Sequence, residues 1–375
     1  MKILIVGAGP AGLYLAYLLR RQRRDADITL VEQNPPGSTV GFGLVFSERA
    51  LDFLYKDDPE THDLIVPAME TWRDLTIVHR GERVRIDGIG FAGIGRLRVL
   101  ELLHQRLEAA GFAPRFQSEI ASDAQLRGYD LVVGADGVNS VVRRTFADRL
   151  GTSIRYLSNK FAWYGTRKQF ATLTQTFLDS EFGPVNAHHY SYSPDTSTFL
   201  VECAPETWER AGFGGMSEAQ SLELCQRIFA EPLGGEKLVS NRSIWRNFPV
   251  IWNERWSVDN VVVIGDALRT AHFSIGSGTR LAMEDAIALA RAVGEYPDDV
   301  RSALQAFEAA RRPIVEKLVA AANASGEWYE RFPEHMKADP LELAMSYIQR
   351  SGRIDRDRLR EISPDFVARY EQAHP

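Results

Sequence analysis

The sequence predicts a protein of mixed α/β and α+β class, in which a parallel α/β domain is split by an inserted, mainly antiparallel β-sheet domain. Short β-branched runs alternate with helical segments before about residue 150 and again after about residue 255, which is typical of parallel sheets. Between them, aromatic-rich runs alternate apolar with polar residues, as antiparallel strands do. The last part of the chain is polar and helical in pattern, with one long helix expected at 300–328 that starts afresh or kinks at Pro313. We expect the α/β domain at 1–154 and 256–295, the inserted domain at 155–255 and C-terminal helices at 296–375.

The composition is that of a soluble globular protein. The 375 residues are 45% hydrophobic and 25% charged, and they suffice for two or three domains. With 50 Asp+Glu against 44 Lys+Arg, the chain lacks the basic footprint of a nucleic-acid binder. Two cysteines are too few for a disulfide scaffold or a four-thiolate zinc site, so we expect a reducing, cytoplasmic location and no metal.

The N-terminal segment has the order strand, helix, strand. Residues 2–6 predict a buried strand, 11–24 a helix and 27–32 a second strand. The apolar run at 3–19 is interrupted by glycines and Pro10 and ends at an arginine cluster. We therefore expect neither a signal peptide nor a membrane span.

The turn after the first strand carries the G-x-G-x-x-G pattern of dinucleotide-binding βαβ units. Its glycines are Gly7, Gly9 and Gly12, and Glu32 follows twenty residues after the third. Gly7 permits the tight turn, Gly9 allows the backbone to approach a pyrophosphate, and Gly12 allows close helix packing. The helix N-terminus then faces the phosphates, and Glu32 accepts hydrogen bonds from a ribose.

A second match to the same pattern, formed by Gly88, Gly90 and Gly93, lacks this context. It follows a strand-like segment at 83–86, but no strand ending in an acidic residue lies at the right distance beyond it. We interpret it as a glycine-rich loop. After this loop we expect a helix at 99–110 and a strand around 114–117.

Two further predicted strands end in acid-glycine turns. The strand at 130–134 runs into Asp136 and Gly137, and the strand at 261–264 runs into Gly265 and Asp266. Gly276 and Gly278 follow, and then a helix at 279–293. Because open α/β sheets bind ligands at the carboxyl ends of their strands, we expect these turns to converge on one crevice.

Together these motifs resemble a known family. The G-x-G-x-x-G with Glu32, the Asp136-Gly137 turn with Arg143, and the Gly265-Asp266 motif with Gly276 and Gly278 are similar to the three signatures of group A (single-component) FAD-dependent aromatic hydroxylases. The resemblance implies a split Rossmann-like, GR2-like FAD-binding domain, with NAD(P)H as co-substrate.

Within that family, several segments resemble the salicylyl-CoA 5-hydroxylase and anthraniloyl-CoA monooxygenase branch. They are 41–47, 93–96, 163–166, 196–199, 272–279 and the tail 346–367. Tryptophan-pathway flavin hydroxylases share the Trp163 segment and the run His272-Phe273-Ser274, so they remain the alternative. Bifunctional anthraniloyl-CoA enzymes continue into a reductase domain, whereas this sequence stops at Pro375, and we therefore expect ring hydroxylation without ring reduction.

The resemblance also implies roles for individual residues. The G-x-G-x-x-G glycines and Glu32 hold the ADP part of FAD, Arg96 and Asp136 contact the phosphate and ribityl region, and Asp266 the ribityl chain. Gly276, Gly278 and Thr279 precede a helix whose positive end stabilises reduced flavin. Since the chain has one convincing dinucleotide fold, NAD(P)H is expected to bind transiently at the surface.

The implied reaction is hydroxylation of an electron-rich aromatic acyl-CoA by O2 through a flavin C4a-hydroperoxide. Salicylyl-CoA would give gentisyl-CoA; the alternative is a tryptophan-derived or 2-aminobenzoyl-CoA substrate. No nucleic acid or membrane takes part, and the enzyme is expected to be a monomer or homodimer.

Three residues are candidates for catalysis: His272, Phe273 and His188. The motif places His272 and Phe273 beside the flavin ring, where a neutral imidazole can hydrogen-bond a phenol or an aniline; the alternative for His272 is a packed loop histidine. His188 and the adjacent His189 point to opposite faces if they lie on a strand, which argues against a two-histidine metal site. One of them lines the substrate pocket or is an ordinary sheet histidine.

Overall fold

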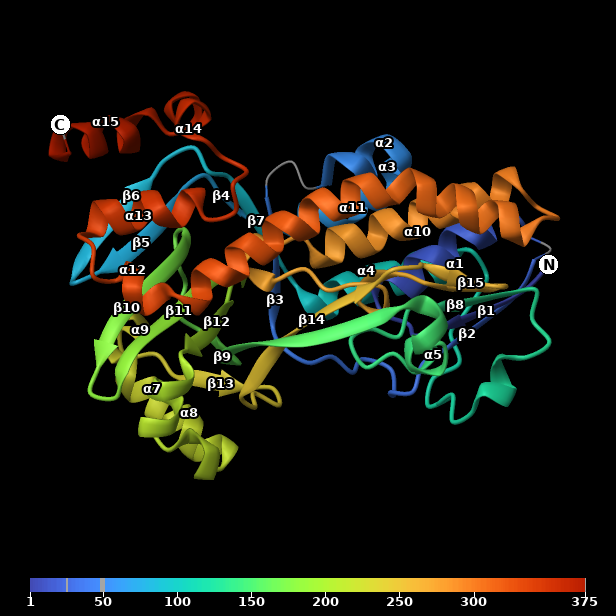
Figure 1. Cartoon of the computed structure of the whole chain (residues 1–375), viewed down its shortest axis with the longest axis horizontal. Helices are drawn as coiled ribbons and strands as arrows, with labels where there is room; N and C mark the ends of the chain where they lie inside the picture. Colours follow the sequence, from blue (N-terminus) through green and yellow to red (C-terminus); the bar gives the residue numbers. More distant parts are fainter. Residues whose placement is uncertain (25, 48–50, 375) are drawn as a thin grey trace.

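The computed structural model describes residues 1–24, 26–47 and 51–374. Figure 1 shows two lobes, with a parallel sheet and the N-terminus in one and a larger sheet and the C-terminus in the other. Helix α11 (Val300–Glu330) runs along the molecule and reaches both lobes. In the part of the chain that is described, no helix combines the length and the apolar character needed to cross a membrane.

The first sheet has the strand order β15-β16-β8-β1-β2. Its strands are β1 (Lys2–Val6), β2 (Asp27–Val31), β8 (Leu131–Gly134), β15 (Ser257–Val258) and β16 (Val261–Val263). β2, β1, β8 and β16 are parallel, so their carboxyl ends meet at one edge, as predicted. Helices α1 (Pro10–Gln22) and α10 (Gly278–Glu295) confirm the predicted helices there. The strand expected around 114–117 is reduced to a single bridge between Val31 and Arg115.

The second sheet has the order β13-β9-β12-β11-β10-β5-β6, and β14 also pairs with β9. Its strands are β5 (Leu75–His79), β6 (Glu82–Ile86), β9 (Thr152–Thr166), β10 (Leu173–Ser180), β11 (Gly183–Ser193), β12 (Thr196–Cys203), β13 (Leu238–Ser240) and β14 (Arg246–Asn253). It is antiparallel except for the β10 and β5 pair. The expected antiparallel sheet is therefore present.

Strands β5 and β6 come from the segment 1–154 but pair with the second sheet, through the register of β5 with β10. The sheet is thus not built from one continuous insertion. The domain boundaries at 154, 255 and 295 remain a proposal. Residues 75–86 belong to the second sheet, although they lie within the segment 1–154.

A small third sheet joins the lobes in the order β3-β7-β4. Its strands are β3 (Gly43–Ser47), β4 (Glu70–Trp72) and β7 (Phe91–Gly95). Of the second glycine pattern, Gly88 and Gly90 lie between β6 and β7 as a loop, whereas Gly93 lies inside β7. The loop interpretation is therefore correct for the first two glycines and wrong for the third.

The other helices cover the edges of the two lobes. They are α2 (Asp52–Asp57), α3 (Pro59–Ile65), α4 (Arg96–Ala109), α5 (Val141–Thr145), α6 (Ala147–Leu150), α7 (Pro205–Arg210), α8 (Glu218–Ile228), α9 (Ala230–Leu233), α12 (Phe332–His335), α13 (Pro340–Gln349), α14 (Arg356–Ile362) and α15 (Pro364–Ala373). The expected helical tail is confirmed. Helix α11 runs on through Pro313 without a fresh start.

Candidate active site

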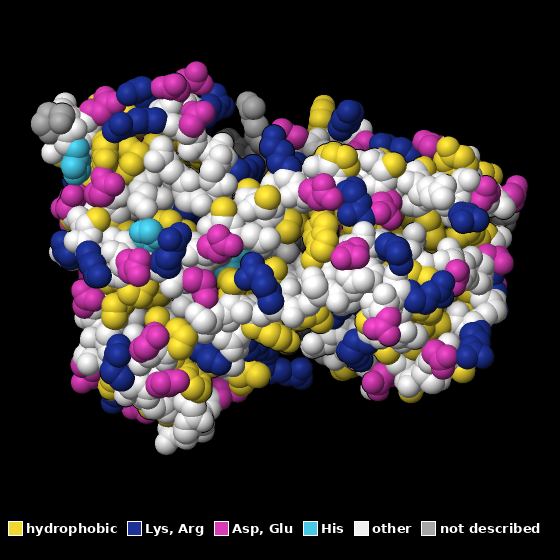
Figure 2. Space-filling view, in the orientation of Figure 1, with side chains coloured by type: hydrophobic (Ala, Val, Ile, Leu, Met, Phe, Trp, Pro, Cys, Tyr) yellow, Lys and Arg dark blue, Asp and Glu magenta, His cyan; other side chains and the backbone are white. Residues whose placement is uncertain are grey.

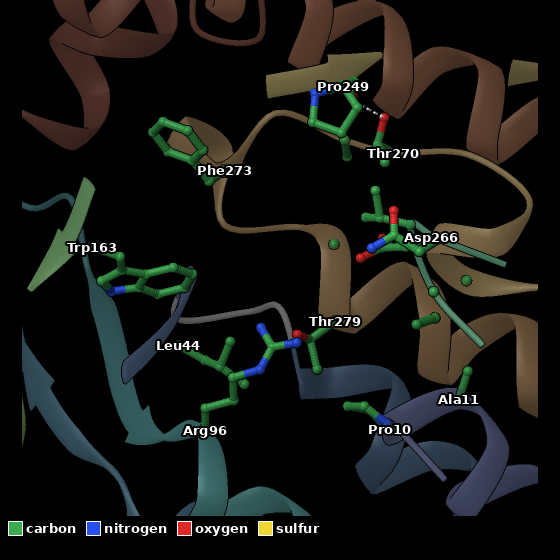
Figure 3. Close-up of a pocket in the computed structure, with 18 of the residues that line it drawn as sticks. Pro10, Ala11, Leu44, Arg96, Trp163, Pro249, Asp266, Thr270, Phe273 and Thr279 are labelled. Atoms are coloured by element: carbon green, nitrogen blue, oxygen red, sulfur yellow. Dashed lines mark hydrogen bonds between the residues drawn. The ribbon is translucent and has the colours of Figure 1, made fainter. Parts of the chain in front are cut away.

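A cavity of about 810 Å³ lies between the carboxyl edge of the first sheet and one face of the second. The turns after β1, β8 and β16 form one wall, and side chains of β9, β10, β11 and β12 form the other. Figure 3 shows Asp266, Thr279 and Pro10 on the first side and Trp163 and Phe273 on the second. The predicted turns therefore converge as expected.

The glycine turn after β1 leaves room for an anion. Gly7 has φ +100°, and a Cβ there would lie 2.5 Å from the carbonyl oxygen of Ala135. A Cβ on Gly12 would lie 1.9 Å from the carbonyl oxygen of Gly7, so Gly12 packs the helix onto the turn and does not line the cavity. A Cβ on Gly9 would meet nothing within 4 Å. Helix α1 begins at this opening with no side-chain cap, which leaves its first N–H groups for a phosphate.

Glu32 is held at the cavity wall by its own neighbours. Its Oε2 accepts from the backbone N–H of Ala8 at 2.9 Å, and its Oε1 accepts from the N–H and Nδ2 of Asn34 at 2.9 and 2.7 Å. These bonds fix the carboxylate at the end of β2, where the remaining lone pair of Oε2 can accept from a ribose hydroxyl.

Asp136 lines the cavity but also caps helix α5. Its carboxylate accepts from the Ser140 hydroxyl at 2.5 Å and from the N–H groups of Val141 and Val142 at 2.7 and 3.3 Å. Burial raises the pKa of Asp136, and these hydrogen bonds oppose the shift. The sequence motif identified Asp136, but it did not indicate that this carboxylate accepts hydrogen bonds from the first N–H groups of helix α5.

Arg96 and Asp266 are half-buried charged residues that line the cavity, and their side chains have no hydrogen-bond partner among the described residues. Burial lowers the pKa of Arg96, and burial raises the pKa of Asp266 while Arg269 and Arg96 lower it. In Figure 3 the Arg96 guanidinium reaches toward Thr279. A cationic donor and an anionic acceptor left free in one cavity suit a ligand with phosphates and hydroxyls.

Beneath Asp266, a buried ion-pair network fixes the turn after β16. Asp285 of α10 accepts from the N–H of Gly265 at 3.1 Å, from Arg269 at 2.7 Å and from Arg311 of α11 at 3.2 Å. Nothing in the sequence pattern singled out these side chains, because their partners lie 16 or more residues apart.

The start of α10 forms the last part of this wall. Gly276 has φ +61°, and a Cβ there would lie 2.7 Å from the carbonyl oxygen of Val45, so the tight turn requires glycine. The helix N-cap, Ser277, makes no side-chain cap. Gly278 and Thr279 therefore present free N–H groups and a positive helix end to the cavity.

The opposite wall is mostly aromatic and follows from strand register. Trp163 on β9, Leu200 on β12, His188 on β11 and Gln175 on β10 are consecutive cross-strand partners, so their side chains share one face. The other aromatic side chains that line this part are Phe161, Tyr190, Phe248 and Phe273. Tyr164 faces the opposite way and is fully buried in the core.

The three catalytic candidates separate in the structure. Phe273 and His188 line the cavity, but His272 does not. His272 is buried, its Nδ1 bonds to the Ser274 hydroxyl at 2.7 Å, and its ring lies 4.2 Å from that of Phe273. His272 thus lies behind Phe273, and its catalytic role stays a prediction. His189 points to the other face, stacked on Phe199 with 5.0 Å between ring centroids.

The residues present fit FAD. The uncapped starts of α1 and α10, the open cradle at Gly9 and the free Arg96 suit a diphosphate, and Glu32 and Asp266 suit hydroxyl groups. Bound FAD would supply reduction by NAD(P)H and activation of O2.

The comparisons with known proteins agree with this geometry. Residues 1–322 match the FAD binding domain family. The chain is 39% identical to the salicyloyl-CoA 5-hydroxylase of a Streptomyces species, over 99% of this chain and 73% of that protein. It is 38% identical to the 3-hydroxy-4-methyl-anthranilyl-[aryl-carrier protein] 5-monooxygenase of Streptosporangium sibiricum, over 89% of this chain and 90% of that protein.

More distant relatives share the fold. Protodeoxyviolaceinate monooxygenase of Chromobacterium violaceum is 35% identical over 92% of this chain and 94% of its own. Among solved structures, 2-methyl-3-hydroxypyridine-5-carboxylic acid oxygenase has a TM-score of 0.73 at 18% identity, covering 98% of this chain and 97% of its own. The chain thus belongs to the FAD-binding-domain family of flavoprotein aromatic monooxygenases, which use FAD and NAD(P)H.

Proposed function

We propose that this monooxygenase hydroxylates the ring of an electron-rich aromatic acyl-CoA, converting salicylyl-CoA to gentisyl-CoA. The alternative substrate is 2-aminobenzoyl-CoA or a tryptophan-derived compound. Two of the relatives are named for aromatic acids carried on CoA or on a carrier protein, and the third is named for protodeoxyviolaceinate, which leaves the alternative open.

The observation that carries this proposal is the division of one cavity into a polar and an aromatic half. FAD would lie in the polar half, held by Gly7, Gly9, Glu32, Arg96 and Asp266, with the flavin ring near Thr279. The remaining proposed contacts are Asp136, Gly265, Gly276 and Gly278, and Gly12 contributes by packing helix α1 onto the glycine turn. The substrate ring would then lie between the flavin and the aromatic wall, where Phe161 and Phe273 stand 5.0 Å apart between ring centroids.

The mouth of the cavity suits an anionic carrier. Two arginines that line the cavity are exposed to solvent: Arg246 at the start of β14 and Arg144 in α5. Arg246 follows the aromatic wall, since it pairs with Phe161. We infer that the CoA phosphates lie against these arginines while the acyl ring reaches inward. On the face in Figure 2, basic and acidic side chains are interspersed.

The chain's own residues would direct the reaction by position. The aromatic wall excludes water from the flavin, and the positive start of α10 stabilises negative charge that develops on the reduced cofactor. Phe273 and His188 contact the substrate ring, while His272 supports Phe273 from behind. A cytoplasmic location and a monomeric or homodimeric state belong to the same proposal; both cysteines are free and buried.

The test measures NAD(P)H oxidation, O2 uptake and product for purified, FAD-loaded protein with salicylyl-CoA, 2-aminobenzoyl-CoA and tryptophan in turn. We expect equal stoichiometry of all three quantities with salicylyl-CoA. If every aryl-CoA yields hydrogen peroxide as the only product, the acyl-CoA assignment is wrong. A colourless protein that reduces a substrate without O2 would make it a dehydrogenase.

A further inference from the structure

Unpartnered polar atoms gather directly behind His188. Five of the buried side-chain atoms that have no hydrogen-bond partner among the described residues lie there: Asn159 Oδ1, Asn186 Oδ1 and Nδ2, His188 Nε2 and Glu202 Oε2. All four residues lie on β9, β11 or β12, and each is at most 6% exposed. Because buried polar groups are almost always paired, such a group of exceptions indicates a functional role.

Strand register brings His188 and Glu202 to the same face of the sheet. Asn186 is the cross-strand partner of Glu202, and Leu200 is that of His188, so the histidine and the carboxyl group are diagonal neighbours. His188 Nε2 lies 3.5 Å from Glu202 Oε2. The other carboxyl oxygen, Oε1, accepts from Asn159 Nδ2 at 2.9 Å.

The imidazole bridges this buried carboxyl group and the cavity. His188 lines the cavity beside Gln175 and Leu200, while its Nε2 is turned inward to Glu202. Its ring is held between Tyr329, stacked at 4.8 Å and 26°, and the edge of Phe273 at 5.5 Å. A ring held by these two neighbours can accept a proton at one nitrogen and release a proton from the other without turning.

The surroundings of the pair keep the imidazole neutral and give the carboxyl group the higher affinity for a proton. Burial and the charge of Arg350, the residue that follows α13, lower the pKa of His188 to about 3. The rings of His272 and Tyr329 also lie beside His188. Burial and the nearby Glu330 of α11 raise the pKa of Glu202 to about 8, against the hydrogen bond from Asn159.

We propose that His188 and Glu202 form a proton relay that deprotonates the phenolic hydroxyl group of the bound aromatic substrate. The substrate O–H bond breaks and its proton goes to His188 Nδ1, while the proton on Nε2 passes to the Glu202 carboxylate. The imidazole is neutral before and after, and the single negative charge moves from Glu202 to the substrate. The ring thereby becomes richer in electrons for attack by the electrophilic oxygen.

His188 is the catalytic residue of this relay, and Glu202 acts through it as a positioning and proton-accepting residue. The inference rests on the proposed function for the identity of the substrate. It assigns to Glu202 a role that no motif in the sequence suggested.

The first test compares wild-type holoenzyme with Glu202→Gln, which keeps the size of the side chain and its acceptor for Asn159 but cannot take up a proton. The hydroxylation step is measured in single turnovers of reduced enzyme with salicylyl-CoA and O2 from pH 6.5 to 9.5. We expect the wild-type rate to rise through about pH 8, because the relay needs the carboxylate. In E202Q the profile should be flat and the rate at pH 9 lower by about 10²-fold, with unchanged substrate affinity.

The matched control is Glu181→Gln, an exposed acid in the turn between β10 and β11, which should keep the wild-type profile. The double variant His188→Phe with Glu202→Gln should lose no more rate than His188→Phe alone, since the two residues act as one unit. A wild-type pH profile in E202Q, with FAD still bound, would overturn the relay.

A second readout does not depend on turnover. Infrared difference spectra of the oxidised holoenzyme between pH 7 and 9 should show a protonated carboxyl band that disappears at high pH, shifts when 4-nitrophenol binds, and is absent in E202Q. If salicylyl-CoA is not hydroxylated but this band responds to the phenol, the proposed substrate is wrong and the relay stands. A band that is missing or insensitive to the phenol contradicts the relay.

Discussion

At the scale of single residues, position relative to the cavity separates side chains that the sequence treats alike. His188 and His272 are both buried histidines near Phe273, yet only His188 lines the cavity. The motif predicted His272 beside the flavin, whereas in the structure Phe273 of the same loop lines the cavity and His272 packs against the ring of Phe273. Which of these two neighbouring residues lines the cavity depends on the three-dimensional path of the loop at 270–278, which the sequence motif does not specify.

We therefore predict that His272→Ala mainly affects stability. The change removes the bond to Ser274 and leaves space beside Gly326, whose added Cβ would lie 3.3 Å from the His272 ring. The free energy of unfolding should fall by about 1–3 kcal/mol. Peroxide release should increase less than in Phe273→Ala, which exposes the flavin directly. If His272→Ala and Phe273→Ala form equal amounts of peroxide per NAD(P)H oxidised, His272 takes part in the reaction and this prediction is wrong.

Arg96 gives a second prediction at this scale. Because its guanidinium has no partner among the described residues, Arg96→Met should weaken FAD binding by about tenfold or more without destabilising the FAD-free protein. Flavin fluorescence titration and the thermal unfolding midpoint of the FAD-free protein measure the two effects. A large loss of stability with unchanged FAD affinity would assign Arg96 a structural role.

At the scale of elements, the sequence predicted those strands and helices that carry strong local signals. β1, α1, β8, β16 and α10 all appear close to their expected bounds. The prediction of a strand at 114–117 was wrong because this segment pairs with β2 through a single bridge. A local sequence pattern does not distinguish a bridge from a strand. The continuity of α11 through Pro313 likewise depends on packing against α10, which local propensity does not include.

The junction of α10, α11 and the turn after β16 depends on Asp285. Its neighbours Arg269 and Arg311 have side chains that are 1% and 7% exposed. Because Arg311 also pairs with Glu284 at 2.9 Å, Asp285→Asn would leave Arg269 without its carboxylate partner and Arg311 with one partner instead of two. We predict a loss of about 3–5 kcal/mol in the free energy of unfolding, together with weaker FAD binding. Urea unfolding measures the first quantity. Asp259→Asn, which breaks an exposed pair with Arg149, is the control and should change stability by less than about 1 kcal/mol.

At the scale of the whole molecule, the order of the motifs predicted the shared cavity, but not which segments build its second wall. The three glycine turns follow parallel strands, whose carboxyl ends must meet, so their convergence could be predicted. The pairing of β5 with β10 joins residues nearly a hundred positions apart, and the diagonal contact between His188 and Glu202 depends on that sheet's register. Such long-range register leaves no local signal in a single sequence.

The buried histidines make a prediction for the whole fold. Burial lowers the pKa values of His188, His189 and His272 from 6.5 to about 3. Since the unfolded chain takes up these protons first, folding stability is complete above about pH 6.5 and falls as the pH drops toward 3. The urea midpoint should decrease steadily from pH 7 to 5. His189→Phe, on the face away from the cavity, should reduce this slope by about one proton; an unchanged slope would contradict the assignment.

The central claim is that the cavity places an aromatic acyl-CoA against FAD so that one oxygen atom of O2 enters the ring. The most direct test is turnover of salicylyl-CoA by the FAD-loaded protein under ¹⁸O₂, with mass spectrometry of the product. The account predicts a hydroxylated acyl-CoA that carries one ¹⁸O atom in its new ring hydroxyl. A product without the label, or labelled peroxide with no ring-hydroxylated product, would contradict it.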